Sequence, residues 1–266
     1  MTERALLLSS TESLVGVLTD AAETDATRPA FVFLNAGLLH RIGPNRLHVR
    51  LARELAGRGF ASLRFDLSGL GDSGPRRDGL PLRAAAVADT REALDALAAN
   101  GPSTFVLAGL CSGADLAFRA ALDDERVVGL VLIDGLPYKT TRAVLIEQAK
   151  RAQRLIRHGD WHKLGHIHKL VGRPAAPAAM GNRDVPTRAD AAIGLRRLTE
   201  RGVQVLAIYT EGREYMYPRQ FAHLFPSVRP DRVRVEFFKD ADHIFTLRAN
   251  QDRLARVVVE WSGGFR

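Results

Sequence analysis

Apolar runs and amphipathic runs alternate along most of this 266-residue chain. A continuous apolar run rich in β-branched and aromatic residues predicts a buried strand, and a 3.6-residue apolar periodicity that stops at glycine predicts a helix. The predicted strands cover 5–9, 13–20, 29–37, 60–65, 103–110, 126–135, 203–210 and 232–240. The predicted helices cover 45–59, 82–101, 112–122, 217–225 and 248–263.

This alternation has a direct meaning for the fold. Strands that are apolar throughout, separated by helices, indicate a mostly parallel sheet with helices on both faces, and the first two runs indicate an antiparallel pair. The alternation of strands and helices stops after Pro137. Residues 138–201 are predicted to contain helical segments and a Pro/Ala-rich break but no strand. We therefore expect an α/β core of eight strands from 1–137 and 202–266, with 138–201 as a helical lid inserted after the sixth strand.

Cysteine usage and the N-terminus narrow the class of protein. The chain has one cysteine, so it needs no intramolecular disulfide and no oxidising compartment. The N-terminus is charged at once, and no apolar run is long enough to cross a bilayer. We expect a cytoplasmic protein that is not bound to a membrane.

The formal net charge of +8 has two interpretations. Most of the cations are arginines, which often reflects base composition rather than a partner. The alternative is an anionic ligand, such as a coenzyme A tail or an acidic carrier protein. Nucleic acid is not expected, because the sequence has no zinc pattern, RNP motif or convincing helix-turn-helix.

The chemistry centres on "GLCSG", which has glycines two residues before and two after Cys111. A strand that turns sharply into a helix holds its central residue in a strained conformation, and side chains at the flanking positions would clash. The turn also places the central residue at a helix N-terminus, where the dipole favours a thiolate. Cys111 is therefore the candidate nucleophile, and the alternative is a buried cysteine at a tight turn.

Two further loops complete a catalytic pattern. "DADH" follows the last predicted strand and supplies His243 as a candidate base. "LNAGLL" follows the first core strand, where the amide of Leu38 would join the amide of Ser112 in an oxyanion hole. This order of nucleophile and histidine is typical of one architecture.

With these segments in place the chain resembles the α/β-hydrolase superfamily, in particular its lysophospholipase and serine-aminopeptidase-like branch. The resemblance rests on "LNAGLLH", "RFDLSGLGDSG", "GLCSG" and "DADH" and covers nearly the whole chain. It implies an α/β-hydrolase fold and hydrolase-type chemistry without a cofactor. Most relatives carry serine where this chain has Cys111, whereas dienelactone hydrolases and some thioesterase-like members are similar in using cysteine.

The triad acid has more than one candidate. Family members usually place an aspartate after the strand that matches "VQVLAIYT", but this chain has "YTEGREYMYP" there, with Glu211 and Glu214. Some members take the acid from the preceding strand, which here ends in Asp134. A carboxylate at the end of an apolar run needs a partner when it is buried, and His243 would be one. We expect Asp134 to be the acid, with Glu214 next.

Other polar residues are weaker candidates. Five residues are predicted to bind substrate because they lie close to the expected active site in sequence. Those that follow the predicted oxyanion loop are His40, Arg41 and Asn45, and those at the predicted edge of the active site are Tyr215 and Tyr217. The predicted lid also holds four histidines: His158, His162, His166 and His168. Two have the spacing of a helical metal pair, but Gly165 interrupts the helix, so we expect a solvated basic face and no metal site.

These residues predict an enzyme that acts on an ester or thioester acyl group through Cys111, His243 and an acid, with a covalent acyl-enzyme. The acyl-enzyme would itself be a thioester, so an acyltransferase, a cyclase or an amide-forming offloading enzyme is the alternative. A hydrolase-like binding protein without catalysis is the third. The expected partner is a small-molecule acyl substrate, and the sequence leaves the oligomeric state open.

Overall fold

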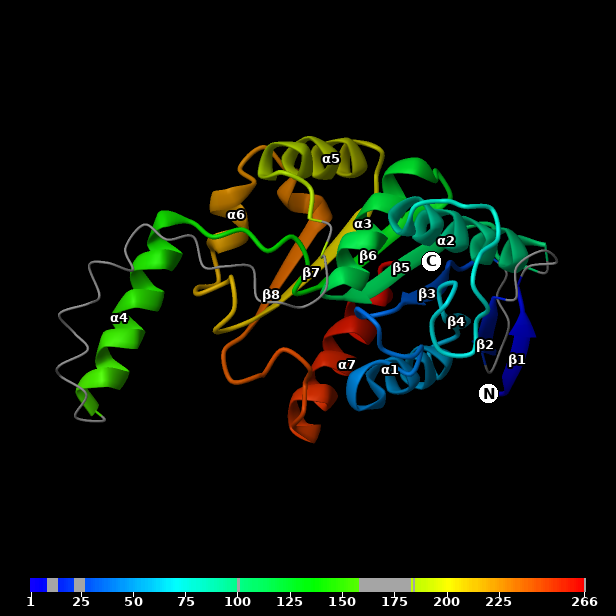
Figure 1. Ribbon diagram of the computed structural model, residues 1–266, viewed down its shortest axis with the longest axis horizontal. Coiled ribbons are helices and arrows are strands. Elements are labelled where there is room, and N and C mark those ends of the chain that lie inside the picture. Colours follow the sequence, from blue (N-terminus) through cyan, green and yellow to red (C-terminus); the bar gives the residue numbers. More distant parts are fainter. Residues whose placement is uncertain (9–13, 22–26, 100, 158–182, 184, 266) are drawn as a thin grey trace.

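An eight-stranded sheet forms the centre of the computed structural model, which describes residues 1–8, 14–21, 27–99, 101–157, 183 and 185–265 (Figure 1). The strands are β1 (Glu3–Leu7), β2 (Val15–Thr19), β3 (Ala30–Leu34), β4 (Ser62–Phe65), β5 (Phe105–Leu110), β6 (Val127–Ile133), β7 (Gln204–Thr210) and β8 (Val233–Phe238). Their order in the sheet is β1-β2-β4-β3-β5-β6-β7-β8. Strand β2 is antiparallel to its two neighbours, β1 and β4, and every other pair is parallel, which confirms the predicted mostly parallel sheet.

The central strands are apolar throughout because helices cover both faces of the sheet. Every residue of β3 and β5 is buried. Helices α1 (Leu47–Ala56) and α7 (Arg248–Ser262) lie on one face (Figure 1). The other face carries α2 (Leu82–Ala98), α3 (Ser112–Asp123), α5 (Arg188–Glu200) and the short α6 (Gln220–Leu224). Each face has its own hydrophobic cluster.

Two helices begin later than their apolar periodicity predicts. The segment expected to be helical from Asn45 starts with a 3-10 turn, Pro44–Arg46, and the α-helix begins at Leu47. Asn45 and Arg46 have φ of 50° and 60°, outside the right-handed helical region. The helix expected over 217–225 shortens to α6, because residues 217–219 form a turn before it.

The segment predicted to be a lid contains two described helices. Helix α4 (Thr141–Arg157) extends away from the sheet (Figure 1), and Ala143 is its one buried residue. Ala143 packs with Met216 and Tyr217 in a small hydrophobic cluster. Helix α5 instead packs on α3 and contributes to the core. The division of the chain at residues 137 and 201 stays a prediction.

Residues 158–182 and 184 lie outside the described part of the chain, and with them the four histidines of the predicted lid and most of the Pro/Ala-rich break. None of the described helices combines the length and the apolar character needed to cross a membrane.

Candidate active site

The candidate residues come from loops at one edge of the sheet. Cys111 directly follows β5 and Asp134 directly follows β6. Gly37 lies in the loop after β3, and His243 lies in the loop after β8. The carboxyl ends of parallel strands share an edge, and in open α/β sheets this is where ligands bind. Four segments far apart in sequence therefore meet at one place.

Cys111 occupies a strained turn between β5 and α3. Its backbone has φ 59° and ψ −121°, which is costly for a residue with a Cβ atom. The turn is held because the Cys111 amide donates to Ile133 O at 2.8 Å and the Ala114 amide donates to Cys111 O at 3.0 Å. These bonds fix the strained backbone of Cys111.

The two glycines of this turn are required by close backbone contacts. A Cβ atom on Gly109 would lie 2.3 Å from the carbonyl carbon of Gly113. A Cβ atom on Gly113 would lie 2.5 Å from Asn35 O and 2.8 Å from Leu34 O. The helix can start this close to β3 only without side chains at both positions, as the sequence pattern predicts.

Asp134 and His243 form a buried pair. Oδ2 of Asp134 lies 2.7 Å from Nδ1 of His243, and the side chains of Asp134 and His243 are 6% and 12% exposed. Thr210, the last residue of β7, also holds the carboxylate: its amide donates to Oδ1 at 2.8 Å and its hydroxyl to Oδ2 at 2.6 Å. The carboxylate is therefore fixed in place, and it orients the imidazole.

The charge states of Cys111 and His243 are coupled. Burial raises the pKa of the Cys111 thiol, but the hydrogen bond with His243 and the charges of Arg183 and His243 outweigh burial and lower it overall. Burial lowers the pKa of His243, but hydrogen bonds to Asp134 and Cys111 outweigh it and raise the pKa to about 9. Both directions favour a thiolate beside an imidazolium.

The two glutamates after β7 have other partners. Glu211 pairs with Lys150 of α4. The carboxylate of Glu214 lies 3.7 Å from Nε of Arg213, and its backbone carbonyl accepts a hydrogen bond from Gln220. The carboxylate that the structure places at His243 is that of Asp134.

The loop after β3 reaches the cysteine turn through Gly37. The Gly37 amide donates to Ser112 Oγ at 2.7 Å. Gly37 has φ of 62°, which glycine adopts readily. The neighbouring side chain of Leu38 is 84% exposed. The structure therefore brings the segment of Leu38 to Ser112, and the bond it shows there is made by Gly37.

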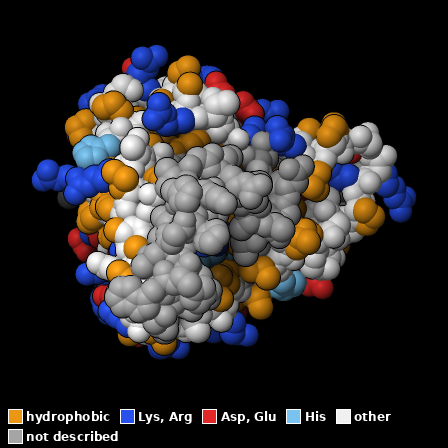
Figure 2. Space-filling view, turned by 60° about the vertical axis from the view of Figure 1, so that its left-hand side comes forward, with side chains coloured by type: hydrophobic (Ala, Val, Ile, Leu, Met, Phe, Trp, Pro, Cys, Tyr) orange, Lys and Arg blue, Asp and Glu red, His pale blue; other side chains and the backbone are white. Residues whose placement is uncertain are grey.

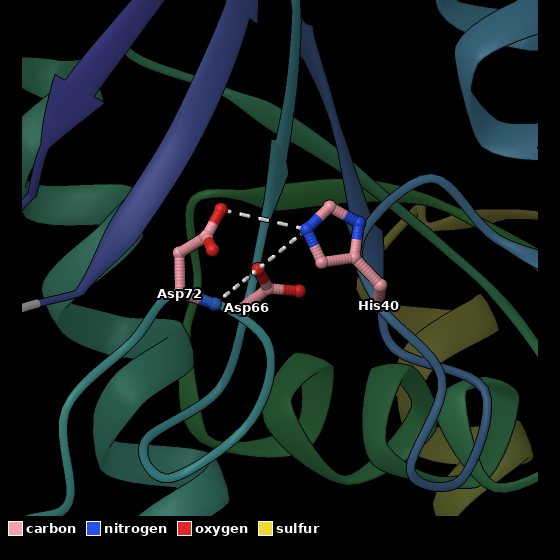
Figure 3. A group of neighbouring side chains, drawn as sticks. All are labelled: His40, Asp66 and Asp72. Carbon is pink, nitrogen blue, oxygen red and sulfur yellow. Dashed lines mark hydrogen bonds and ion pairs between the residues drawn. The ribbon is translucent and has the colours of Figure 1, made fainter.

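Residues after this loop form a polar cluster (Figure 3). The imidazole of His40 faces the carboxylates of Asp66 and Asp72, with Nε2 at 3.5 Å from an oxygen of each. Nη1 of Arg41 lies 2.8 Å from His40 Nε2 and 2.7 Å from Asp72, and it also contacts the fully buried Asp66. Asn35 donates to Asp66 as well.

This cluster has the donor set of a cation site, with imidazole and carboxylate atoms within 4.8 Å of one another. The guanidinium of Arg41, however, already supplies the positive charge between them. A metal ion would have to displace that guanidinium and leave it unpaired. The arrangement fits an arginine-centred network that shapes the loop.

The remaining predicted binding residues make internal contacts. Asn45 Nδ2 donates to Ile244 O at 3.0 Å and so supports the loop that carries His243. Tyr215 is buried and stacks on Tyr209 with 3.4 Å between ring centroids. The Tyr217 hydroxyl lies 3.0 Å from both Thr140 Oγ1 and His223 Nδ1. A role of these residues in binding substrate stays a prediction.

Three residues of the site carry no signal in the sequence. Thr210 ends a buried strand, Asp115 lies in the first turn of α3, and Arg183 lies in a proline- and alanine-rich stretch. All three contact the candidate residues or their backbone. Asp115 is close to Cys111 because it lies four residues on in the same turn of α3. Packing between distant segments brings Thr210 and Arg183 to the site, and no spacing rule predicts those contacts.

The comparisons with known proteins identify the family and the fold of the chain. A model described as the alpha/beta hydrolase family matches residues 31–257. The chain belongs to the α/β hydrolase family. The match spans all four segments of the site, and membership supports a hydrolase-type protein. No curated protein matches the chain.

Several solved structures share the α/β hydrolase fold of this chain. A meta-cleavage product hydrolase from Pseudomonas fluorescens has a TM-score of 0.62 at 15% identity, over 98% of this chain and 97% of that one. A dienelactone hydrolase from Anabaena variabilis has 0.61 at 15% identity, over 99% and 98%. A proline iminopeptidase from Mycobacterium smegmatis has 0.60 at 17% identity, over 99% and 98%. At these identities the likeness shows the fold.

Proposed function

We propose that this α/β hydrolase acts on the acyl carbonyl of an ester or thioester, with Cys111 as nucleophile, His243 as base and acid, and Asp134 as the orienting carboxylate. The observation that carries the proposal is the buried contact of His243 Nδ1 with Asp134 at 2.7 Å, beside a cysteine held in a strained turn. The lowered pKa of Cys111, to which His243 contributes, supports it. A hydrolase-like binding protein would have no use for a strained cysteine held against such a pair.

The chemistry follows from the charge states. The thiolate attacks the acyl carbonyl, the tetrahedral intermediate collapses, and the imidazolium gives its proton to the leaving alcohol or thiol. Water then attacks the thioester of Cys111, and His243 takes the proton of that water. The acid is released, and the thiolate–imidazolium pair is restored.

The developing oxyanion needs donors beside the sulfur. We assign them to the backbone amides of Ser112 and Leu38, which stabilise the negative oxygen without carrying a charge. The hydrogen bond from Gly37 to Ser112 Oγ holds the two segments together and supports this assignment. Loss of one such donor typically costs about 3 kcal/mol of transition-state stabilisation.

Acyl transfer is the second candidate, favoured by the cysteine itself. An acyl-cysteine is a thioester, which reacts with amines as well as with water. The same residues would then form an amide, an ester or a ring. Product analysis with water alone, and with amine or alcohol acceptors, separates transfer from hydrolysis.

The form of the substrate is also a proposal. A small acyl group carried on coenzyme A or on an acidic carrier protein suits both the chemistry and the net charge of +8. An electrostatically assisted encounter of this kind weakens as salt increases.

The test is covalent labelling of the intact protein. Cys111 is the single cysteine, so a mass increase that hydroxylamine removes reports acylation there. Incubation with a panel of acyl thioesters and esters is expected to give one acyl group per chain, and Cys111→Ala is expected to abolish both labelling and turnover. Full turnover by Cys111→Ala would overturn the proposal.

A further inference from the structure

We infer that Arg183 is a positioning residue that joins the Cys111 turn to the Asp134 turn and holds a positive charge beside the sulfur. The inference rests on the proposed cysteine chemistry of the same site. It goes beyond that chemistry by assigning a role to a residue that the proposed reaction does not use.

The guanidinium of Arg183 contacts both turns through one nitrogen. Nη2 donates to Asp134 O at 2.8 Å and to Cys111 O at 3.3 Å. These are the backbone carbonyls of the candidate acid and the candidate nucleophile. The side chain of Arg183 is 15% exposed, so these bonds are largely shielded from water.

Asp115 completes the connection from inside the protein. Its Oδ2 accepts from Arg183 Nε at 2.5 Å, and its Oδ1 accepts from the Leu136 amide at 2.9 Å. Asp115 lies in the first turn of α3, and its side chain is 3% exposed. One buried carboxylate therefore holds the arginine on one side and the backbone just after Asp134 on the other.

These bonds hold backbone conformations that side chains rarely adopt. Asp134 and Leu136 have φ of 48° and 49°, and Cys111 has φ of 59°. Strain of this kind persists where the surroundings over-determine it. Arg183 and Asp115 supply bonds to the backbone of all three residues.

The charge of Arg183 acts on the sulfur together with its neighbours. Two charged groups act on the pair of Cys111 and His243: Asp134 after β6 and Arg213 after β7. Two more act on Arg183: Asp115 on α3 and Glu214 after β7. Arg183 attracts the thiolate and lowers the pKa of Cys111. It also neutralises Asp115, whose negative charge four residues from Cys111 would otherwise oppose the thiolate.

Two variants of Arg183 separate the effect of its positive charge from the effect of its hydrogen bonds to the two turns. Arg183→Gln removes the charge, and the pH midpoint of iodoacetamide alkylation of Cys111 is expected to rise by roughly one unit, at the low end of the shift that a neighbouring opposite charge causes. Arg183→Lys keeps the charge but lacks the planar fork that spans two carbonyls and a carboxylate. It is expected to keep most of the wild-type midpoint and to lower kcat with little change in KM.

Arg201 offers a matched control at the other end of α3. Its Nη2 donates to the carbonyls of Ala121, Asp124 and Val127 at 2.8, 3.1 and 3.3 Å. Arg201→Gln removes a similar set of backbone bonds far from the sulfur. It is expected to lower the Tm while leaving the alkylation midpoint and kcat unchanged.

The outcomes distinguish this inference from the proposed function. An unchanged midpoint in folded Arg183→Gln overturns the inference, while acylation of Cys111 would still stand. If Arg183→Gln does not fold, Arg183→Lys decides: wild-type kcat and midpoint together would overturn it. If the wild type gives no acyl adduct and its Cys111 titrates as an ordinary thiol near pH 8.5, the proposed function fails first.

Discussion

The carboxylate of Asp134 is held in place by the ends of two strands and by His243. It follows the last apolar residue of β6, where a buried carboxylate needs partners. Thr210 and His243 provide three contacts to its two oxygens, and the backbone around it takes a left-handed conformation. The end of β7 therefore supports the carboxylate with a threonine and supplies no acid of its own to His243.

The acid can be tested by isosteric amides. In Asp134→Asn the side chain loses its charge, and its NH₂ group cannot accept the hydrogen of His243 Nδ1, so kcat/KM for a thioester is expected to fall by roughly 10²–10⁴-fold. Glu214→Gln is the matched control and is expected to stay within about twofold, because its carboxylate faces Arg213. Steady-state hydrolysis measures both, and an equal loss in both variants contradicts the assignment to Asp134.

The sequence predicts the candidate residues that follow strand ends. It does not predict the residues that hold them in place. Cys111, Asp134 and His243 each follow a predicted strand, so a parallel sheet places them at one edge, and the order typical of the family separates them from other residues there. The supporting contacts of Arg183, Asp115 and Asn45 depend on side-chain directions between segments 20 to 200 residues apart, as in the bond from Asn45 to Ile244 with a separation of 199. Local patterns contain no information about such contacts.

At the scale of elements, the crossing of α3 over the end of β3 fixes the cysteine turn. The helix starts where Gly113 lies against the carbonyls of Leu34 and Asn35. The same β3 end leads into the loop of Gly37, which bonds to Ser112. The end of β3, the loop of Gly37 and the start of α3 therefore contact one another at Gly113 and Ser112. An extra atom at Gly113 would displace all three.

The close contact of α3 with the end of β3 predicts that one added methyl group destabilises the protein. Gly113→Ala puts a Cβ atom 2.5 Å from Asn35 O, so the free energy of unfolding is expected to fall by about 1–3 kcal/mol, and labelling of Cys111 is expected to slow. Gly101→Ala serves as control, since a Cβ atom there would meet nothing within 4 Å. Urea denaturation measures the change, and wild-type stability of Gly113→Ala would show that the turn relaxes easily.

Element types followed from the periodicity of the sequence, while element boundaries depended on turn geometry. The central strands β3 and β5 form where continuous apolar runs occur, because burial on two faces demands such runs. The periodicity predicts that α1 begins two residues before its actual start, since Asn45 and Arg46 continue the helical pattern but have positive φ. A residue forced into that region by its neighbours looks ordinary in the sequence.

At the scale of the whole molecule, much of the positive charge has partners within the chain. Arg53 and Arg64 share Glu3, Arg76 contacts Asp78, Asp89 and Glu92, and Arg126 contacts Asp95 and Asp124. On the face shown in Figure 2, the described lysines and arginines lie around the periphery, with hydrophobic side chains between them. The net charge of +8 is therefore partly compensated by ion pairs within the described part of the chain.

Stability of the whole molecule is expected to depend on one histidine remote from the cysteine. His48 of α1 is fully buried and stacks on Phe33 with 5.3 Å between ring centroids, and burial lowers its pKa from 6.5 to about 4. Between these two pH values the unfolded chain binds a proton that the folded protein excludes. The stabilisation is therefore complete above pH 6.5 and is lost as the pH falls toward 4, by about 3 kcal/mol in total.

Removing that proton site should flatten the dependence of stability on pH. His48→Gln is expected to be less stable at pH 7, because it loses the ring contact, and to lose about 3 kcal/mol less than the wild type between pH 6.5 and 4. Urea denaturation at a series of pH values measures the two slopes. Equal slopes in His48→Gln and the wild type would mean that folded His48 takes up its proton as readily as the unfolded chain.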